Sequence, residues 1–593
     1  MPTEAMAHER IPNWKALAVL SSDALSSVAY ATEEILIPLS LLSVAAMSWS
    51  LPIAVAVGLL LIIITLSYQQ TIECYPHGGG AYTVSKENIG THAGLIAGAS
   101  LLIDYILTVA VSVSAGVQNM AAAIPYVDNH KVVCGVVIVI FIAVMNLRGI
   151  RESSNIFALP TYFFIFSLMT LLAGGTYRYL MGEIPNPAPI IHETYPDVQI
   201  FLILKAFSSG CAALTGIEAI SNGVPIFKTP SHTNAKKTMV WMTLILGVMF
   251  LGLTFLAHTF RITPIHGQTV ISQLSMSIFG KGIFFYICQG TTAAILVLAA
   301  NTSYADFPRL ASLISRDGFL PRQFSSMGDR LVFSNGIIAL SAAAAFLIVI
   351  FKGDTHLLIP LYAVGVFLSF TLSQTGMIIF HFREREAHWI KSAFLNFVGA
   401  ITTFAVLIVI AMTKFLSGAW IVVILIPLLV SLFKSIQRHY KDVNDQLTRK
   451  LHRSAPVSGR LGHVAVVPVS GIHPGVLDAI NYALSLTQDV RCCYVNLDPH
   501  ITEQLKSEWP KWAPHTQLVV LDSPYRSVIT PVLNFLDNVG LETYGDMITV
   551  VIPEFVTSKW YHQLLHNQTA LVLRTALKFK RGKFITSVRY YLD

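Results

Sequence analysis

Residues 21–30 read Ser-Ser-Asp-Ala-Leu-Ser-Ser-Val-Ala-Tyr, a polar segment that interrupts the apolar stretch of residues 15–47. An ionisable side chain at the centre of a bilayer costs about 2.5–3.5 kcal/mol even on lenient insertion scales, so Asp23 needs a reason to lie there. Tyr30 follows seven residues later and shares the helix face of Asp23 if the helix continues. If the helix breaks here, freed backbone carbonyls join the carboxylate as ligands.

A second interrupted stretch spans residues 199–226. Its residues 208–218 read Ser-Ser-Gly-Cys-Ala-Ala-Leu-Thr-Gly-Ile-Glu, in which two glycines favour a break. Thr215 precedes Glu218 by three residues, so both side chains lie on one helix face. Interrupted helices at corresponding places in two halves of a transporter point to its binding site. The two interrupted stretches are five apart along the chain, which fits a five-plus-five inverted repeat.

A third apolar stretch carries a carboxylate without an interruption. Asp104 lies in Leu-Leu-Ile-Asp-Tyr-Ile-Leu-Thr, and Thr108 and Ser112 follow it at helical spacing. A carboxylate and two hydroxyls then form one stripe of oxygen ligands. Such stripes suit hard cations rather than anions or apolar ligands.

The composition explains why these three acids stand out. The 593 residues are 54% hydrophobic and only 12% charged, and the mean hydropathy is +0.61. An ordinary soluble protein carries about 25% charged residues, so a soluble enzyme, a disordered chain, a coiled coil and a disulfide scaffold are excluded. About 20 apolar residues cross the hydrocarbon core as a helix. Twelve stretches are long and apolar enough for this prediction: 15–47, 52–74, 92–124, 132–147, 155–177, 199–226, 238–260, 282–304, 333–351, 356–380, 394–413 and 417–433.

Basic residues predict the orientation of these spans. If the chain starts inside and alternates, 15 Lys and Arg residues fall in cytoplasmic segments and 7 in external ones. Both termini are therefore expected in the cytoplasm. The first stretch begins near Trp14 and lacks a small-residue cleavage site, so it predicts a span rather than a signal peptide. The six cysteines form no CxxC or metal spacing, which favours neither a disulfide framework nor a transition-metal site.

The last quarter of the chain differs from the rest. Residues 434–593 hold 31 charged residues and residues 1–433 hold 42, so the charge density about doubles. We expect a membrane domain over 1–433, a connecting helix over 434–455 and a cytosolic domain over 456–593. Strand-like and helical patterns alternate in the tail, which predicts a parallel α/β sheet. The strands are expected at 463–469, 491–497, 517–522, 547–552 and 584–591, and the helices at 474–486, 501–512 and 558–579.

Each carboxylate also has a structural interpretation. Asp23 could end a helix near the cytoplasmic face, Asp104 could pair with a buried donor, and Glu218 could cap a helix at the break. No Lys or Arg lies inside the expected spans at mid-membrane, and Lys205 is the nearest basic residue. An uncompensated acidic cluster attracts a cation or stays protonated, and both outcomes suit a cation carrier coupled to protons. Tyr362 in the tenth stretch is consistent with either packing or a ligand role.

Two cytoplasmic loops carry more specific patterns. Residues 76–82 read Pro-His-Gly-Gly-Gly-Ala-Tyr, and residues 316–322 read Arg-Asp-Gly-Phe-Leu-Pro-Arg. The glycines are not followed by Gly-Lys-Ser/Thr, so a flexible gate or re-entrant turn is favoured over a phosphate loop. With two interrupted helices, these loops make residues 1–433 resemble the amino acid–polyamine–organocation (APC) superfamily. The resemblance implies a LeuT-like fold of 12 transmembrane helices, with substrate held between broken helices one and six.

Within the superfamily, the chain resembles the KimA-type potassium importers, grouped with the KUP potassium/proton symporters. Amino-acid permeases usually place a Gly-rich break in the first helix, whereas this chain has Ser-Ser-Asp there. The resemblance implies proton-coupled potassium uptake by a homodimer in the cell membrane, with no cofactor. We expect proton coupling at Glu218 or Asp104, and we favour Glu218 because a buried Glu has the easier upward pKa shift when potassium leaves. The residues it implicates in potassium binding are Asp23, Tyr30, Asp104, Thr108, Ser112, Thr215, Glu218 and Tyr362.

The tail resembles the universal-stress-protein-like domain appended to these importers. Such domains dimerise, and some bind adenine nucleotides or cyclic di-AMP. The usual Gly-rich nucleotide fingerprint is missing here, and residues 469–475 (Val-Ser-Gly-Ile-His-Pro-Gly) are the nearest candidate, at an expected strand-to-helix turn.

Other functions fit the sequence less well. An amino-acid or polyamine permease is the main alternative, because a polyamine would also bind an acidic site. A sensor whose tail is the output is a third hypothesis. No nucleophile–base pair, metal cluster or phosphate loop points to an enzyme. The formal net charge of +7 does not require nucleic acid as a partner.

Overall fold

The computed structural model divides the chain into two compact units, Met1–Gln446 and Leu447–Asp593, which are described separately below. The residues that the structure describes are 10–42, 45–76, 78, 80–148, 154–183, 199–265, 267–325, 333–385, 388–453, 463–496, 499–523, 528–542, 547–556, 568–578, 580 and 582–591.

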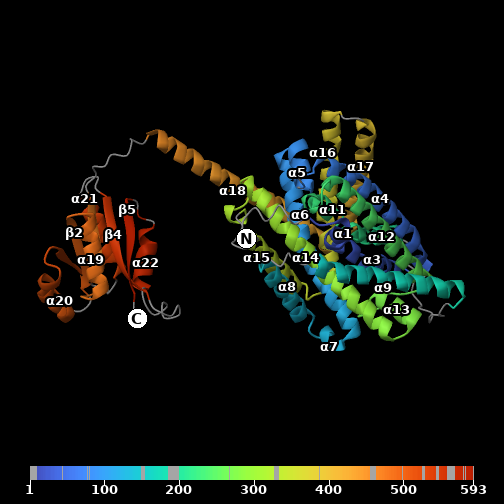
Figure 1. Cartoon of the computed structure of the whole chain (residues 1–593), viewed down its shortest axis with the longest axis horizontal. Helices are drawn as coiled ribbons and strands as arrows, with labels where there is room; N and C mark the ends of the chain where they lie inside the picture. Colours follow the sequence, from blue (N-terminus) through green and yellow to red (C-terminus); the bar gives the residue numbers. More distant parts are fainter. Residues whose placement is uncertain are drawn as a thin grey trace. The chain divides into compact units, whose positions relative to one another are not determined.

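The first unit is helical (Figure 1). Its α-helices are α1 (Asn13–Leu20), α2 (Ser22–Ser26), α3 (Val28–Ser40), α4 (Ser50–Cys74), α5 (Gly80–Asn88), α6 (Thr91–Ala123), α7 (Pro125–Asp128), α8 (Lys131–Leu147), α9 (Ser154–Leu180), α10 (Gln199–Gly210), α11 (Glu218–Asn222), α12 (Ser231–Thr259), α13 (Val270–Phe279), α14 (Ile283–Arg316), α15 (Ser334–Ile350), α16 (Thr355–Glu384), α17 (Trp389–Lys414) and α18 (Trp420–Arg453). Short 3₁₀ or π turns are η2 (Ala45–Trp49), η4 (Cys211–Leu214), η5 (Val224–Ile226), η6 (Arg322–Phe324) and η7 (Phe415–Ala419).

Within the described residues, eight helices are long and apolar enough to cross a membrane. Each of the twelve apolar stretches predicted from the sequence overlaps a helix, but the count of twelve spans stays a prediction. The first stretch is divided among α1, α2 and α3, while α17 and α18 run on through a kink at Gly418. Helix α13 is a short apolar helix that the prediction did not include.

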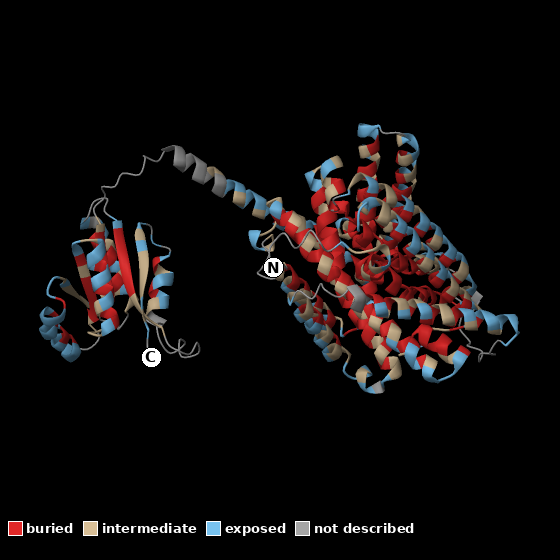
Figure 2. Cartoon of the chain, in the orientation of Figure 1, coloured by how far each residue is buried: buried red, intermediate tan, exposed pale blue. Residues whose placement is uncertain are grey.

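Helix α6 is the most enclosed of the eight. Within its most apolar window 89% of the residues are buried, against 17% for the window in Trp389–Asp442. It packs against α14 and α16, so its side chains face protein rather than lipid (Figure 2). The predicted stripe of Asp104, Thr108 and Ser112 therefore lies inside the bundle.

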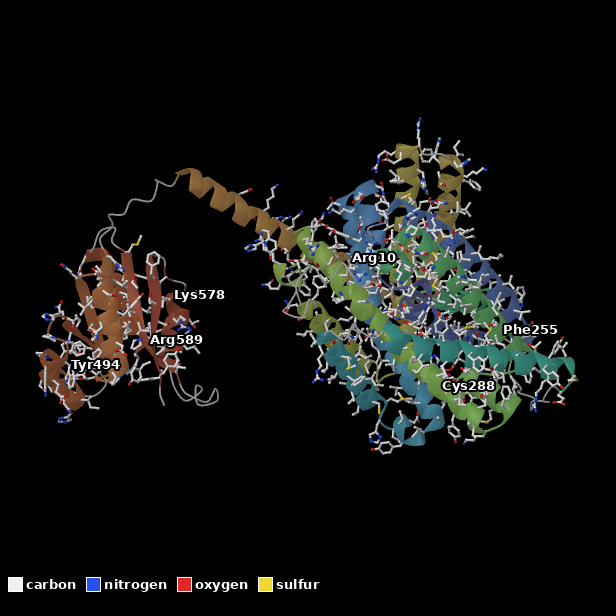
Figure 3. The ribbon with its side chains drawn as sticks, viewed as in Figure 1. Arg10, Phe255, Cys288, Tyr494, Lys578 and Arg589 are labelled. Carbon is white, nitrogen blue, oxygen red and sulfur yellow. The ribbon has the colours of Figure 1, made fainter. Side chains whose placement is uncertain are left out.

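The N-terminal residues pair with the chain that follows the second interrupted stretch. Ile11 donates its backbone N–H to the Ile226 carbonyl at 2.9 Å, and Arg10, labelled in Figure 3, donates to the Thr229 hydroxyl. The start of α1 and the end of the α10–α11 segment are thus joined directly.

The second unit is a parallel α/β domain, as the sequence predicts. Its strands β1 (His463–Val469), β2 (Asp489–Asn496), β3 (Gln517–Asp522), β4 (Met547–Val556) and β5 (Lys583–Tyr591) form one sheet in the order β3-β2-β1-β4-β5, with every pair parallel. Its helices are α19 (Pro474–Leu486), α20 (Pro499–Trp512), α21 (Ile529–Glu542) and α22 (Gln568–Leu577).

Helices cover both faces of this sheet. One apolar cluster joins the sheet to α19 and α20, through residues such as Val476 and Trp509. A second joins the opposite face to α21 and α22, through residues such as Leu536 and Leu577. Helix α21 was not predicted from the sequence, and the part of the expected helix 558–579 before residue 568 lies outside the described residues.

Candidate cation-binding site

The first interruption is a distortion of the helix. Ser21 separates α1 from α2 and Ser27 separates α2 from α3. The Ser26 hydroxyl donates to the Asp23 carbonyl at 2.8 Å, and the Ser27 hydroxyl donates to the Ala24 carbonyl at 2.6 Å. The Ala24 carbonyl also accepts the Ser27 backbone N–H at 3.3 Å, so the serine hydroxyls compete for the carbonyls of the preceding turn. Regular helical hydrogen bonding is therefore interrupted on both sides of Asp23.

The second interruption is a true unwinding. Helix α10 tightens into η4, Thr215 is extended with φ −75° and ψ 150°, and Gly216 adopts φ +80°. Residues other than glycine rarely adopt this left-handed backbone conformation. A Cβ on Gly216 would also lie 2.7 Å from Asp23 Oδ2. Glycine is needed here for both reasons, and the two interruptions touch at this point.

A hydrogen bond also joins the two interruptions. The Ser27 hydroxyl donates to the Ala213 carbonyl at 3.2 Å, in addition to its bond within the first helix. The Tyr30 side chain lies near Thr215, whose own hydroxyl donates to the Ala212 carbonyl at 2.9 Å, and the Tyr30 hydroxyl has no hydrogen-bond partner within the described residues. The structure thus brings together Tyr30 and Thr215, which the sequence resemblance assigned to one site.

The three predicted carboxylates are all buried in this region. Asp23, Asp104 and Glu218 are 5%, 1% and 3% exposed. Asp104 interacts electrostatically with both other acids. Asp23 Oδ1, both oxygens of Asp104 and Glu218 Oε2 have no hydrogen-bond partner within the described part of the chain. Buried charges normally require a partner, so the cluster needs a cation or protons.

Hydroxyl groups border the carboxylates on α6 and α16. The Thr108 hydroxyl donates to the Tyr362 hydroxyl at 3.1 Å, and Tyr362 interacts with Asp23 and Asp104. Tyr362, which sequence reasoning left between packing and binding, is therefore part of the site's surroundings. Ser112 is buried one turn beyond Thr108 on α6.

A fourth acid near the site was not found from the sequence. Asp306 on α14 is 3% exposed and interacts electrostatically with Asp23 and Glu218. The expected span ends at residue 304, so Asp306 falls outside it. The available signal was the polar run Asn-Thr-Ser-Tyr-Ala-Asp at 301–306, which resembles the interruption around Asp23.

Other buried acids have basic partners. His356 Nδ1 lies 2.7 Å from Glu34 Oε1, and His356 Nε2 lies 3.7 Å from Glu33 Oε1. Lys414 is one of the seven basic residues expected in external segments, yet it is 1% exposed and interacts electrostatically with Glu34, without a hydrogen-bond partner for its ammonium within the described residues. These contacts leave Asp23, Asp104 and Glu218 as a separate, uncompensated group.

A cavity of about 330 Å³ adjoins the Glu33–His356 pair. Its lining includes residues from three segments that the sequence places outside the membrane. None of the eight predicted site residues lines it. The lining residues are Glu33, Ile37, Gln118, Lys131, Pro264, Ile265, Gly267, Lys352, Gly353, Asp354 and His356.

Comparison with known proteins identifies the family. A family model described as "KimA potassium transporter C-terminal domain" matches residues 461–590, and one described as "Amino acid permease" matches residues 12–433. The chain is 44% identical to the potassium transporter KimA of Bacillus subtilis (strain 168), over 100% of this chain and 97% of that protein. This chain belongs to the family of KimA-type potassium transporters. The resemblance inferred from the two loop motifs and the interrupted helices is confirmed.

Two more distant relatives of this KimA-type chain are organic-cation or amino-acid transporters. The low-affinity putrescine importer PlaP of Escherichia coli (strain K12) is 24% identical over 59% of this chain and 79% of its own length. Cationic amino acid transporter 3, mitochondrial, of Arabidopsis thaliana is 21% identical over 53% of each chain. The family is one of transporters, which agrees with the inference that the chain is not an enzyme.

Replacement of Gly216 by alanine tests the contact between the two interruptions. Gly216→Ala should lower the melting temperature of the full-length protein in detergent, because a left-handed φ costs a side chain about 1–2 kcal/mol and the new Cβ would overlap Asp23. Gly290→Ala in α14 is the matched control, since nothing lies within 4 Å of its Cβ position. That variant should be neutral or slightly stabilising. Equal melting temperatures for the two variants would contradict the close approach.

Proposed function

We propose that this KimA-type chain imports potassium by symport with protons. The observation that carries the proposal is the meeting of Asp23, Asp104 and Glu218 at two helix interruptions, with carboxylate oxygens that lack partners among the described residues. The 44% identity to a potassium transporter over the whole chain supports potassium as the substrate.

The chemistry of the site favours a hard monovalent cation. Its polar groups are carboxylates and hydroxyls, and oxygen ligands suit hard cations. Two of the carboxylates lie where the backbone leaves regular helical hydrogen bonding, so carbonyl oxygens also become available. The proposed potassium ligands are Asp23, Tyr30, Asp104, Thr108, Ser112, Thr215, Glu218 and Tyr362.

Proton coupling follows from the same electrostatics. Three buried carboxylates in mutual interaction cannot all remain charged beside a single potassium ion, because like charges and burial disfavour the ionised form. Glu218 or Asp104 would therefore hold a proton while the cluster holds potassium. Glu218 is the favoured carrier, since it begins α11 directly after the unwound segment. Potassium and a proton would thus be bound together and travel inward in the same step.

The family and the charge distribution support the wider architecture. We infer a LeuT-like bundle of twelve spans with a five-plus-five inverted repeat over residues 1–433. The ion is held by helices one, three, six and ten of this count. Alternating access follows from movement of the interrupted helices against the rest. The excess of basic residues in alternate loops supports both termini in the cytoplasm and a location in the cell membrane.

The tail is proposed to assemble and regulate the transporter. A linker over residues 434–455 would connect the bundle to a universal-stress-protein-like domain over 456–593. We infer that this domain contributes to a homodimer. The parallel sheet with helices on both faces supports that likeness.

The tail also has a position where a regulatory nucleotide, cyclic di-AMP or an adenine nucleotide, would bind. Residues 470–473 form the turn between β1 and α19, at the carboxyl end of the central strand. Open α/β sheets bind ligands at this edge, where strand order reverses. The rings of His473 and Phe555 lie 5.0 Å apart, and those of Phe555 and Tyr590 lie 6.3 Å apart. An adenine ring would find aromatic surface here.

A polyamine is the alternative substrate. A chain of amines could bridge the same acids, and the likeness to a putrescine importer over 59% of the chain favours testing it. Competition separates the two substrates. Potassium uptake that putrescine does not inhibit supports the potassium site, while putrescine uptake that is insensitive to potassium would contradict it.

Neutralising the carboxylates should abolish potassium uptake. Asp23→Asn, Asp104→Asn and Glu218→Gln should each fail to rescue a potassium-uptake-deficient strain at low external potassium, because each removes a ligand charge. Glu384→Gln is the matched control, since Glu384 is an exposed acid paired with Arg383. It should rescue normally. The proposed site is wrong if all three variants grow like the wild type at equal expression.

Nucleotide binding to the tail can be measured by calorimetry on the purified full-length chain. Cyclic di-AMP and ATP are the probes. Burial lowers the pKa of His473, so the ring is neutral at neutral pH and offers stacking rather than charge. His473→Ala should weaken binding at least tenfold, while His515→Ala at another tail histidine should not change it. Unchanged affinity in His473→Ala, or binding by neither probe, would contradict this location.

A further inference from the structure

Asp306 is a buried carboxylate that the proposed potassium ligands do not include. It lies in the interior of α14, and neither of its carboxylate oxygens has a hydrogen-bond partner within the described residues. Ser303 lies three residues earlier on the same helix face, and its buried hydroxyl also lacks a partner there. Two unpaired oxygen-bearing side chains thus lie on one face of α14.

The nearest positive charge does not neutralise Asp306 fully. Arg309 Nη1 lies 3.7 Å from Asp306 Oδ1, which is beyond hydrogen-bonding distance. The same nitrogen donates to the Asn222 carbonyl at 3.4 Å, and the Arg309 side chain is 33% exposed. Arg309 therefore bridges two elements from the rim of the site, while Asp306 stays inside.

The surroundings of Asp306 connect it to the three-carboxylate cluster. Asp306 interacts electrostatically with Glu218 and with Tyr105 on α6. Asn222, four residues after Glu218, donates its side-chain amide to the Tyr105 hydroxyl at 2.8 Å. One turn before Asp306, the Thr302 hydroxyl hydrogen-bonds with Ser22 of α2 at 3.0 Å. Helices α2, α6, α11 and α14 therefore converge around this acid.

The glycine-rich turn packs against the same junction. A Cβ on Gly78 would lie 2.8 Å from the Asn222 backbone oxygen, and one on Gly80 would overlap the Asn222 side-chain oxygen. The sequence places this turn on the cytoplasmic side. Asn222 thus links the surroundings of Asp306 to the turn, because it contacts Tyr105, Arg309 and the two glycines. A cation that moves from the cluster towards this turn would come near the Asp306 carboxylate.

We propose that Asp306 and Ser303 form a second monovalent-cation site on the cytoplasmic side of the three-carboxylate cluster. Arg309 provides part of the compensating charge when the ion is absent and competes with it. This inference rests on the proposed cation transport, but it adds a separate position for the ion. An ion released from the cluster is held at Asp306 before it reaches the cytoplasm.

The number of bound ions distinguishes this site from the cluster. Equilibrium binding of radioactive rubidium to the purified full-length chain should give two ions per chain for the wild type and one for Asp306→Asn. Glu384→Gln, which removes an exposed carboxylate far along α16, should keep two. One ion in both the wild type and Asp306→Asn would overturn the second site and keep the proposed potassium function. No specific rubidium binding in the wild type would overturn both.

Arg309→Gln should change rubidium affinity in the direction opposite to Asp306→Asn. A merely structural role for Asp306 does not explain such a gain in affinity. Removal of the competing charge should tighten the second, weaker binding step several-fold, while Asp306→Asn removes that step. If Asp306→Asn does not fold, crystals of the wild type grown in rubidium decide the question. An anomalous peak beside the Asp306 carboxylate supports the site, and a peak at the three-carboxylate cluster alone overturns it. An Arg309→Gln variant with unchanged or weaker binding also contradicts the proposed competition.

Discussion

Three carboxylates buried together without a fixed counter-ion are the constraint on which this membrane unit depends. Burying one ionised carboxylate is costly, and placing Asp23, Asp104 and Glu218 in mutual interaction adds repulsion. A helix bundle without a bound cation or proton would gain stability by replacing them with apolar residues. Their presence is therefore understandable only if a positive charge arrives during the working cycle. The surrounding backbone geometry serves the same end, since Gly216 lets the second interruption approach Asp23 closely.

The other buried acids of the bundle have positively charged neighbours. Glu34 contacts His356 and interacts with Lys414, while Asp306 shares the charge of Arg309 with a backbone carbonyl. The buried acids thus differ in how far a fixed positive charge neutralises them. The acids near the cavity are paired, Asp306 on α14 is partly neutralised, and the three-carboxylate cluster has no fixed positive partner among the described residues. A mobile cation would be attracted most strongly where fixed positive charge is weakest. The difference in fixed positive charge therefore suits the central cluster to binding the ion and Asp306 to a second, weaker binding step.

Sequence alone predicted the acids that stand in strongly apolar surroundings. Asp23, Asp104 and Glu218 were found because a charge in an apolar stretch has a clear energetic cost. Asp306 was missed because hydropathy falls over the polar run 301–306, so the expected span ended before it, although α14 continues to Arg316. The contact between Thr108 and Tyr362 joins residues 254 apart, and no local pattern could reveal it. The parallel α/β class of the tail followed from alternating patterns, but α21 was missed, although its buried residues Val532, Leu536 and Val539 recur at helical spacing.

The coupling of potassium to protons is the central claim, and flux in reconstituted vesicles tests it most directly. Purified protein is placed in liposomes with equal potassium on both sides, an inward proton gradient is imposed, and the membrane voltage is clamped by a permeant lipophilic ion. We predict that the wild type raises potassium in the lumen above the external concentration, and that Glu218→Gln does not. An unchanged lumenal potassium concentration with the wild type under the same proton gradient would contradict the coupling.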